Sequence, residues 1–121
     1  MDELVGYRRL HVWQESHELV MMIYKITKKL PKDEMFGLIS QMRRAAVSIS
    51  ANIVEGYARS SKKEFAQFLS VAKGSLAEIE YYLFLIQKLD YISINEYEPL
   101  EEKRRLVGNL LNGFMRSINR S

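Results

Sequence analysis

The side chains that most often carry catalysis are scarce in this sequence. Its two histidines, His11 and His17, are six positions apart and would lie on different faces of a helix, so they do not form a metal-binding pair. Ser48 and Ser75 have no histidine in their own segments to activate them as nucleophiles. The sequence also has no His-Glu-x-x-His motif, no Glu-x-x-His motif, no glycine-rich phosphate loop and no cysteine. We therefore expect a non-enzymatic protein without a metal, a cofactor or a small-molecule substrate.

Basic side chains, by contrast, gather in short groups along the sequence. Lysine and arginine outnumber aspartate and glutamate by 18 to 15, which gives a net charge of +3. Such a balance permits binding to nucleic acid without requiring it. Contacts from these groups would go to phosphate, so binding would depend on salt and discriminate poorly between sequences. The candidate nucleic-acid-binding residues are Arg8, Arg9, Lys25, Lys28, Lys29, Lys32, Arg59, Lys62, Lys63, Lys103, Arg104 and Arg105.

A plainer alternative is that these cations only face water. Lysines near the C-terminal end of a helix complement its dipole, and Glu101 and Glu102 interrupt the basic group at 103–105. Charge runs on helices are most often solvated faces. Arg116 and Arg120 add two more cations near the C-terminus. Both interpretations stay open on the sequence alone.

The elements that must position these groups are predicted to be helices. Four segments carry apolar residues three and four positions apart, the spacing of one helical face. Pro31 would end the first segment, and the pairs Ser61–Glu64 and Ser93–Glu96 have the spacing of capping boxes. The connections are short, which makes sequential helices antiparallel neighbours. The sequence thus predicts one all-α domain over residues 1–121, an antiparallel up-down-up-down four-helix bundle with a lead-in at 1–10 and helices at about 11–30, 34–59, 61–89 and 95–118.

The bundle topology would sort the basic groups between two ends. Lysines 25–32 would lie where the first helix ends and the second begins, and Lys62 and Lys63 at the opposite end, near Arg8 and Arg9. No apolar run approaches the roughly 20 residues that cross a bilayer. The start Met1-Asp2-Glu3 lacks the basic region of a secretory signal. These features favour a cytoplasmic protein that does not contact a membrane.

The segment at 41–59 differs from an ordinary surface helix because apolar residues cover two of its sides. One side carries Met42, Ile49 and Ile53 with small neighbours, and the other carries Val47, Ala51, Val54 and Ala58. A helix that is apolar on two sides is normally buried on two sides, which predicts a homo-oligomer. Gly74 in the middle of the next helix costs about 1 kcal/mol relative to alanine, which suggests a close backbone approach.

The polar residues of the same segment line up on one narrow track. We expect them to form a partly buried polar cluster with the third helix, because a buried charge persists only when it is paired and hydrogen-bonded. The alternative is that Arg44 and Glu55 simply face water. The predicted structural cluster consists of Gln41, Arg44, Ser48, Asn52, Glu55, Ser75 and Glu78.

The run from Ser40 to Gly56 resembles the signature of the bacterial four-helix bundle family, also called the 23S ribosomal RNA intervening-sequence protein or S23 family. The segments 10–14, 30–38 and 65–78 look similar as well, so the resemblance covers about residues 7–118. It implies an antiparallel four-helix bundle and a ring-like homo-oligomer, a pentamer in known relatives. Some members of the family are encoded inside intervening sequences of 23S rRNA genes. A related branch is a basic accessory protein of diversity-generating retroelements that binds nucleic acid.

One position departs from the family pattern: Ser50 stands where relatives often have proline. Losing that proline should straighten the helix slightly. With the resemblance added, the sequence favours a protein that binds RNA or DNA electrostatically as a homo-oligomer. The alternative is a protein-interaction scaffold with no nucleic-acid ligand.

Overall fold

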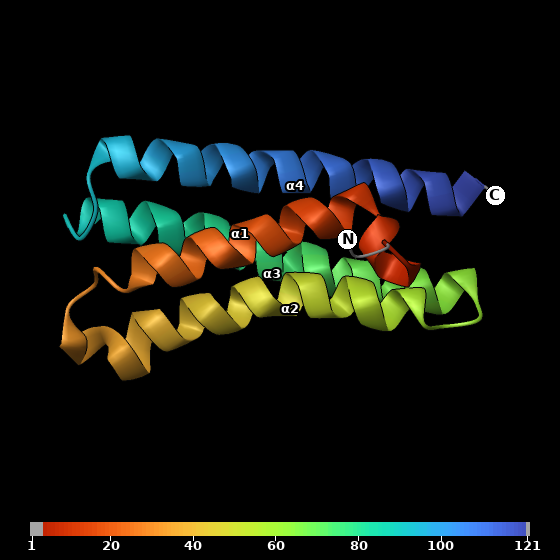
Figure 1. The fold of residues 1–121 in the computed structure, drawn as a ribbon, viewed down its shortest axis with the longest axis horizontal. Coiled ribbons are helices and arrows are strands. Elements are labelled where there is room, and N and C mark those ends of the chain that lie inside the picture. The colour runs from red at the N-terminus through yellow and green to blue at the C-terminus, as the bar shows by residue number, and fades with distance from the viewer. Residues whose placement is uncertain (1–3, 121) are drawn as a thin grey trace.

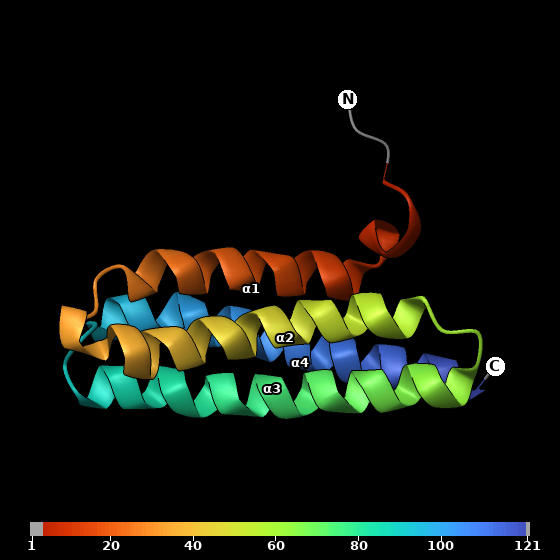
Figure 2. The same ribbon diagram turned by 90° about the horizontal axis from the view of Figure 1, so that it is seen from below.

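The computed structural model describes residues 4–120, and within them four long helices pack as an antiparallel up-down-up-down bundle (Figure 1). Each helix lies beside two others: α1 and α3 both contact α2 and α4. The view in Figure 2 therefore has α1 opposite α3 and α2 opposite α4. The all-α fold predicted from the sequence is confirmed. The elements are η1 (Gly6–Arg9), α1 (His11–Thr27), η2 (Lys32–Glu34), η3 (Met35–Ile39), α2 (Ser40–Tyr57), α3 (Lys62–Lys88) and α4 (Ile94–Arg120).

The core consists of the apolar stripes that the sequence pattern indicates. Leu19 and Ile23 of α1, Ile49 and Ile53 of α2 and Leu83 of α3 have no exposed surface. Burying each such side chain contributes about 1.5–3 kcal/mol. This aliphatic packing, rather than helix propensity, therefore holds the bundle together.

The two predicted capping boxes start α3 and α4. The backbone N–H of Glu64 donates to the Ser61 side chain at 3.1 Å, and that of Glu96 donates to the Ser93 side chain at 3.1 Å. The Glu96 carboxylate in turn accepts from the Ser93 backbone N–H at 2.9 Å. These bonds satisfy N–H groups that have no partner within the helix.

The connection between α1 and α2 differs from the prediction. We expected one helix over 34–59, but the chain makes a short 3₁₀ turn, η2, and a wider turn, η3, before α2 begins at Ser40. Non-helical dihedrals at Gly37 (φ −109°, ψ −109°) interrupt the helix there. The interruption leaves Phe36 94% exposed at this end of the bundle.

A close approach occurs at Gly56, and within the described part of one copy of the chain none occurs at Gly74. A Cβ atom on Gly56 would lie 2.6 Å from Cδ1 of Phe65, so only glycine fits where α2 and α3 meet. A Cβ atom on Gly74 would meet nothing within 4 Å. The sequence pattern attributes the approach at Gly74 to a neighbouring copy, so that approach stays a prediction.

Candidate nucleic-acid interface

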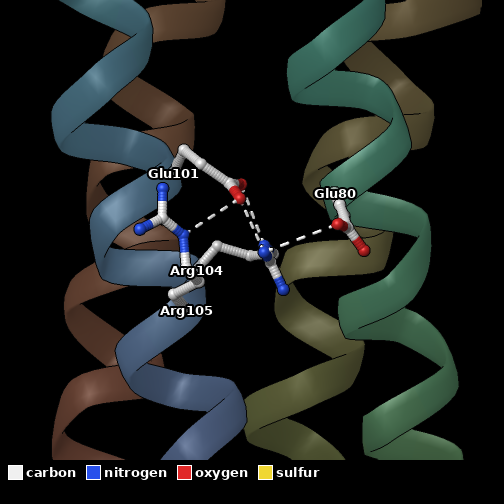
Figure 3. Close-up of polar contacts among 4 residues, drawn as sticks. All are labelled: Glu80, Glu101, Arg104 and Arg105. Atoms are coloured by element: carbon white, nitrogen blue, oxygen red, sulfur yellow. Dashed lines mark hydrogen bonds and ion pairs between the residues drawn. The ribbon is translucent and has the colours of Figure 1, made fainter.

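The predicted basic group on α4 is neutralised by carboxylates. Lys103 Nζ lies 2.7 Å from Glu15 Oε1 on α1, and both side chains are less than one-third exposed. Arg104 donates to both oxygens of Glu101, from Nε at 2.9 Å and from its terminal nitrogen at 2.6 Å, and lies 3.5 Å from Glu80 on α3 (Figure 3). These pairs connect α4 to its two neighbours. Lys103 and Arg104 are therefore structural and no longer candidates for phosphate binding.

Glu101 is the centre of this cluster and is buried, with an exposed fraction of 9%. Its pKa is lowered, chiefly because Arg104 donates hydrogen bonds to the charged carboxylate, and Arg105 adds a longer contact at 3.4 Å. The pKa of Arg104 is raised for the same reason. Arg105 therefore also forms an ion pair with Glu101, although most of the Arg105 side chain is exposed. The sequence indicated only that Glu101 interrupts the basic run; its burial depends on the packing of α4 against its neighbours, which local spacing does not reveal.

At the α1–α2 end, the predicted lysines have different surroundings. Lys29 pairs with Glu96 at the start of α4, and this contact is the main cause of the lowered pKa of Glu96. Lys25, Lys28 and Lys32 are exposed and have no ion pair among residues 4–120. Carboxylates offset these lysines at the same end of the bundle. They are Asp33, Glu34, Asp90, Glu96, Glu98 and Glu102.

The opposite end of the bundle carries more cations than carboxylates. The η1 turn, the last turn of α2, the first turn of α3 and the last turn of α4 meet there (Figure 1). We call the cations of this region the basic end: Arg8, Arg9, Lys62, Lys63, Arg116 and Arg120. The described carboxylates at this end are Glu55, which pairs with Arg59 at 2.9 Å, and Glu64, which caps α3.

The expected proximity of the η1 turn to the end of α2 is confirmed by one hydrogen bond. A terminal nitrogen of Arg9 donates to the Tyr57 hydroxyl at 3.1 Å, and Arg9 Nε donates to the Gly6 carbonyl at 3.3 Å. Arg59 is held as well, because its guanidinium lies 4.7 Å from the centre of the Phe68 ring. The basic end is thus assembled from segments far apart in the sequence and partly fixed in place.

The predicted polar cluster on α2 is smaller than expected. The Ser75 hydroxyl donates to the Ser48 hydroxyl at 2.9 Å, and Asn52 Nδ2 donates to the Ser48 carbonyl at 2.7 Å. Gln41, Arg44 and Glu78 are exposed and outside it, and Glu55 bonds only Arg59 among the residues described. Arg44 and Glu55 therefore face water, as the alternative interpretation has it. Arg44 needs no buried partner because its side chain is exposed to solvent.

The structural arginine of this segment is Arg43, which the sequence analysis missed. Its Nε donates to the Thr27 hydroxyl at 2.9 Å, and its guanidinium lies 4.7 Å from the centre of the Tyr24 ring, both on α1. Ser50 shares a 2.9 Å hydrogen bond with the buried Ser16. Local spacing does not distinguish Arg43 from Arg44, because only the packing of α1 against α2 brings Thr27 to Arg43.

The second apolar side of α2 is open to solvent. Val47 is 42% exposed, Ala51 and Ala58 are exposed, and Val54 is half-buried. We call these four residues and Phe36 the α2 strip. The structure also opens a cleft of about 560 Å³ beside Phe36, which continues through Arg43 and Arg44 to a smaller one bordered by Val47. Apolar residues thus follow α2 over most of its length without cover from the described part of the chain.

Neither histidine belongs to a metal-binding site within residues 4–120. His11 is exposed, and the exposed His17 ring stacks on Trp13 with ring centres 5.1 Å apart. No group of histidine, aspartate or glutamate side chains that could hold a metal occurs within residues 4–120. The same residues include no helix long and apolar enough to cross a membrane.

Comparison with known proteins agrees with the fold and with the residues that carry the resemblance. A crystal structure of a protein of unknown function from the S23 ribosomal protein family of Bacteroides thetaiotaomicron superposes with a TM-score of 0.77. It is 28% identical, and the match covers 86% of this chain and 97% of that one. No curated protein matches the sequence. The family model for the 23S rRNA-intervening sequence protein matches residues 8–113, and the chain therefore belongs to that family.

Proposed function

We propose that this chain is a non-enzymatic, homo-oligomeric protein of the cytoplasm that binds the phosphate backbone of RNA or DNA through its basic end. The observation that carries the proposal is the distribution of charge. Among residues 4–120, cations outnumber carboxylates at the basic end, whereas the two nearly balance at the α1–α2 end. A local excess of cations over carboxylates favours displacement of the counterions of a nucleic acid.

Self-association supplies the second part of the proposal. Monomers rarely leave an apolar strip along most of a helix open to water, and such surfaces usually mark contact sites. One basic end offers only a few phosphate contacts, so a single copy would bind weakly. Several copies held together would present several basic ends to one nucleic acid, which raises the overall affinity without any new contact.

The placement of the cations favours backbone binding over recognition of a base sequence. The basic end contains arginine and lysine at helix termini, where they reach phosphates and not base edges in a groove. We therefore expect similar affinity for unrelated sequences and a dissociation constant in the roughly 10⁻⁴–10⁻⁶ M range per copy at physiological salt.

The direct test is a fluorescence titration of a labelled, structured RNA and a labelled DNA duplex with the protein at two salt concentrations. The proposal predicts binding at low salt that weakens markedly at high salt. An absence of binding at low salt, or binding that is indifferent to salt, would exclude it. The competing function, a scaffold that contacts only other proteins, predicts no binding at either salt concentration, and the α2 strip would then serve protein partners alone.

A further inference from the structure

We propose that a groove along the first turns of α2 binds an acidic amphipathic helix of a partner protein. The groove consists of the cleft beside Phe36 and the smaller cleft bordered by Val47, which share Arg43 and Arg44 as lining residues. It lies at the α1–α2 end of the bundle, opposite the basic end (Figure 1). The proposal therefore does not depend on nucleic-acid binding, and self-association would use the rest of the α2 strip, at Ala51, Val54 and Ala58.

The charged residues that line the groove are all cations. They are Lys28, Lys32, Arg43 and Arg44. Arg43 is held in place by Thr27, whereas the other three are exposed and have no hydrogen bond or ion pair among residues 4–120. Cations lined up without a carboxylate between them repel one another, and an anionic partner relieves that repulsion. The charge of the groove therefore favours an acidic partner.

The carboxylates nearest in sequence do not neutralise the groove. Asp33 and Glu34 are not among its lining residues. The hydroxyl of Tyr91, in the turn between α3 and α4, donates to Glu34 at 2.9 Å. The pKa of Tyr91 is raised, chiefly by this hydrogen bond, and the charge of Asp33 contributes to the shift. Glu34 is thus engaged on the side of the α3–α4 turn, and the groove keeps its excess of positive charge.

The same groove has apolar walls that a purely ionic partner would leave in water. Leu30 and Ile39 line the larger cleft as buried residues, and Met35 and Phe36 border it with exposed fractions of 52% and 94%. Val47, which is 42% exposed, borders the smaller cleft. Exposed apolar surface rimmed by charged residues is typical of a contact site for another protein. The partner therefore needs apolar side chains as well as carboxylates.

The length of the groove and the fold around it favour a helix as the partner element. Ser40 lines the larger cleft and Ser48 the smaller one, and they are about two helical turns or 12 Å apart along α2. Residues 4–120 include no strand whose edge could pair with an extended segment. A helix satisfies its own backbone hydrogen bonds, so it can bind by its side chains alone. Two apolar residues two turns apart would reach both clefts, with carboxylates on either side of them.

Fluorescence anisotropy with a labelled synthetic peptide tests the proposal. The probe is a helix-forming, glutamate-rich peptide with two leucines two turns apart. One control peptide has glutamine in place of each glutamate, and the other has serine in place of each leucine. We expect the probe to bind the wild-type protein and both control peptides to bind at least about tenfold more weakly. A probe that does not bind, or a control peptide that binds equally well, would overturn the proposal.

Two protein variants locate the binding site. Arg44→Glu reverses a charge of the groove, and Phe36→Ser removes its most exposed apolar side chain, so each should raise the dissociation constant of the probe at least about tenfold. The matched controls are Lys73→Glu and Phe84→Ser, at exposed positions of α3, and they should leave it unchanged. Circular dichroism should give the same helix content for all four variants, because each altered side chain is exposed. An unchanged affinity for Arg44→Glu or Phe36→Ser would contradict the proposal.

The same variants distinguish a partner helix from other molecules that could cover the groove. Arg44→Glu should change the affinity for a structured RNA no more than Lys73→Glu does, because each replaces one cation by one carboxylate. A larger loss for Arg44→Glu would assign the groove to phosphate. Binding of phosphatidylserine vesicles that Phe36→Ser abolishes would assign it to a membrane surface. A wild-type assembly whose mass by light scattering decreases in Phe36→Ser would assign it to a second copy. Each of these three results would overturn the proposal.

Discussion

Arg104 and Glu101 lie three positions apart on α4, and two hydrogen bonds of 2.9 and 2.6 Å join the guanidinium to both carboxylate oxygens. The pair is mostly buried, with side-chain exposures of 14% and 11%, and it extends to Glu80 on α3. A bidentate pair of this kind fixes geometry as well as charge. The Arg104–Glu101 pair therefore holds α4 against the bundle. Arg104 is not available to bind a ligand.

Glu101→Gln should destabilise the bundle, because it leaves Arg104 partly buried with a weaker acceptor. We expect a decrease of about 1–3 kcal/mol in the free energy of unfolding, the usual cost of leaving a buried hydrogen-bonding group unsatisfied. Chemical denaturation at neutral pH measures it. Glu102→Gln removes the same charge from an exposed neighbour and is the matched control, expected to stay within about 0.5 kcal/mol.

The same carboxyl group gives the stability a defined pH dependence. The pKa of Glu101 is lower in the folded state than its usual value of 4.5, so the folded state binds this proton less readily than the unfolded chain. Its contribution to stability is present above the unfolded value and is lost as the pH falls through the folded value. Wild-type stability should therefore fall on the acid side of pH 4.5, and Glu101→Gln should make that slope shallower. Urea denaturation at a series of pH values gives the free energy of unfolding of each protein as a function of pH. The same dependence on pH for wild type and Glu101→Gln would contradict this assignment.

Two glycine substitutions should have opposite effects. Gly56→Ala forces a Cβ atom to within 2.6 Å of Phe65 and should cost about 1–3 kcal/mol, as overpacking does. Gly74→Ala meets open space in a helix interior and should stabilise by about 1 kcal/mol. Thermal melts of the two variants, side by side, test the pair. A destabilised Gly74→Ala variant would mean that a partner copy approaches α3 closely at that point.

Asp90 is held in the left-handed region, with φ +60°, in the turn between α3 and α4. The adjoining Tyr91 N–H donates to the Ile86 carbonyl at 2.9 Å, the arrangement that ends many helices and that usually uses glycine. Asp90→Gly should therefore raise the unfolding free energy by about 0.5–1 kcal/mol. Asp90→Ala retains the steric strain and provides the comparison. A denaturation midpoint for Asp90→Gly at or below that of Asp90→Ala would refute the explanation that Asp90 is sterically strained.

Local patterns in the sequence predicted the helices, their order and their caps, because apolar spacing and the Ser–Glu pairs are properties of one segment at a time. The same patterns could not separate Arg43 from Arg44 with certainty, since only the packing of α1 against α2 brings Thr27 to Arg43. Gly56 and Gly74 likewise look alike until the position of Phe65 is known. The role of Lys103 depends on Glu15, which is 88 positions away, and no spacing rule reveals that pair.

The central claim is that the basic end binds phosphate, and the salt dependence of RNA affinity tests it most directly. Lys63→Gln combined with Arg116→Gln removes two cations from the basic end, whereas Lys73→Gln combined with Lys88→Gln removes two from elsewhere on α3. In plots of log affinity against log salt, the first variant should have a shallower slope, by about 0.7–0.9 for each phosphate that it no longer neutralises. The second variant should keep the wild-type slope. Equal slopes for the two variants, at equal net charge, would contradict phosphate binding by the basic end.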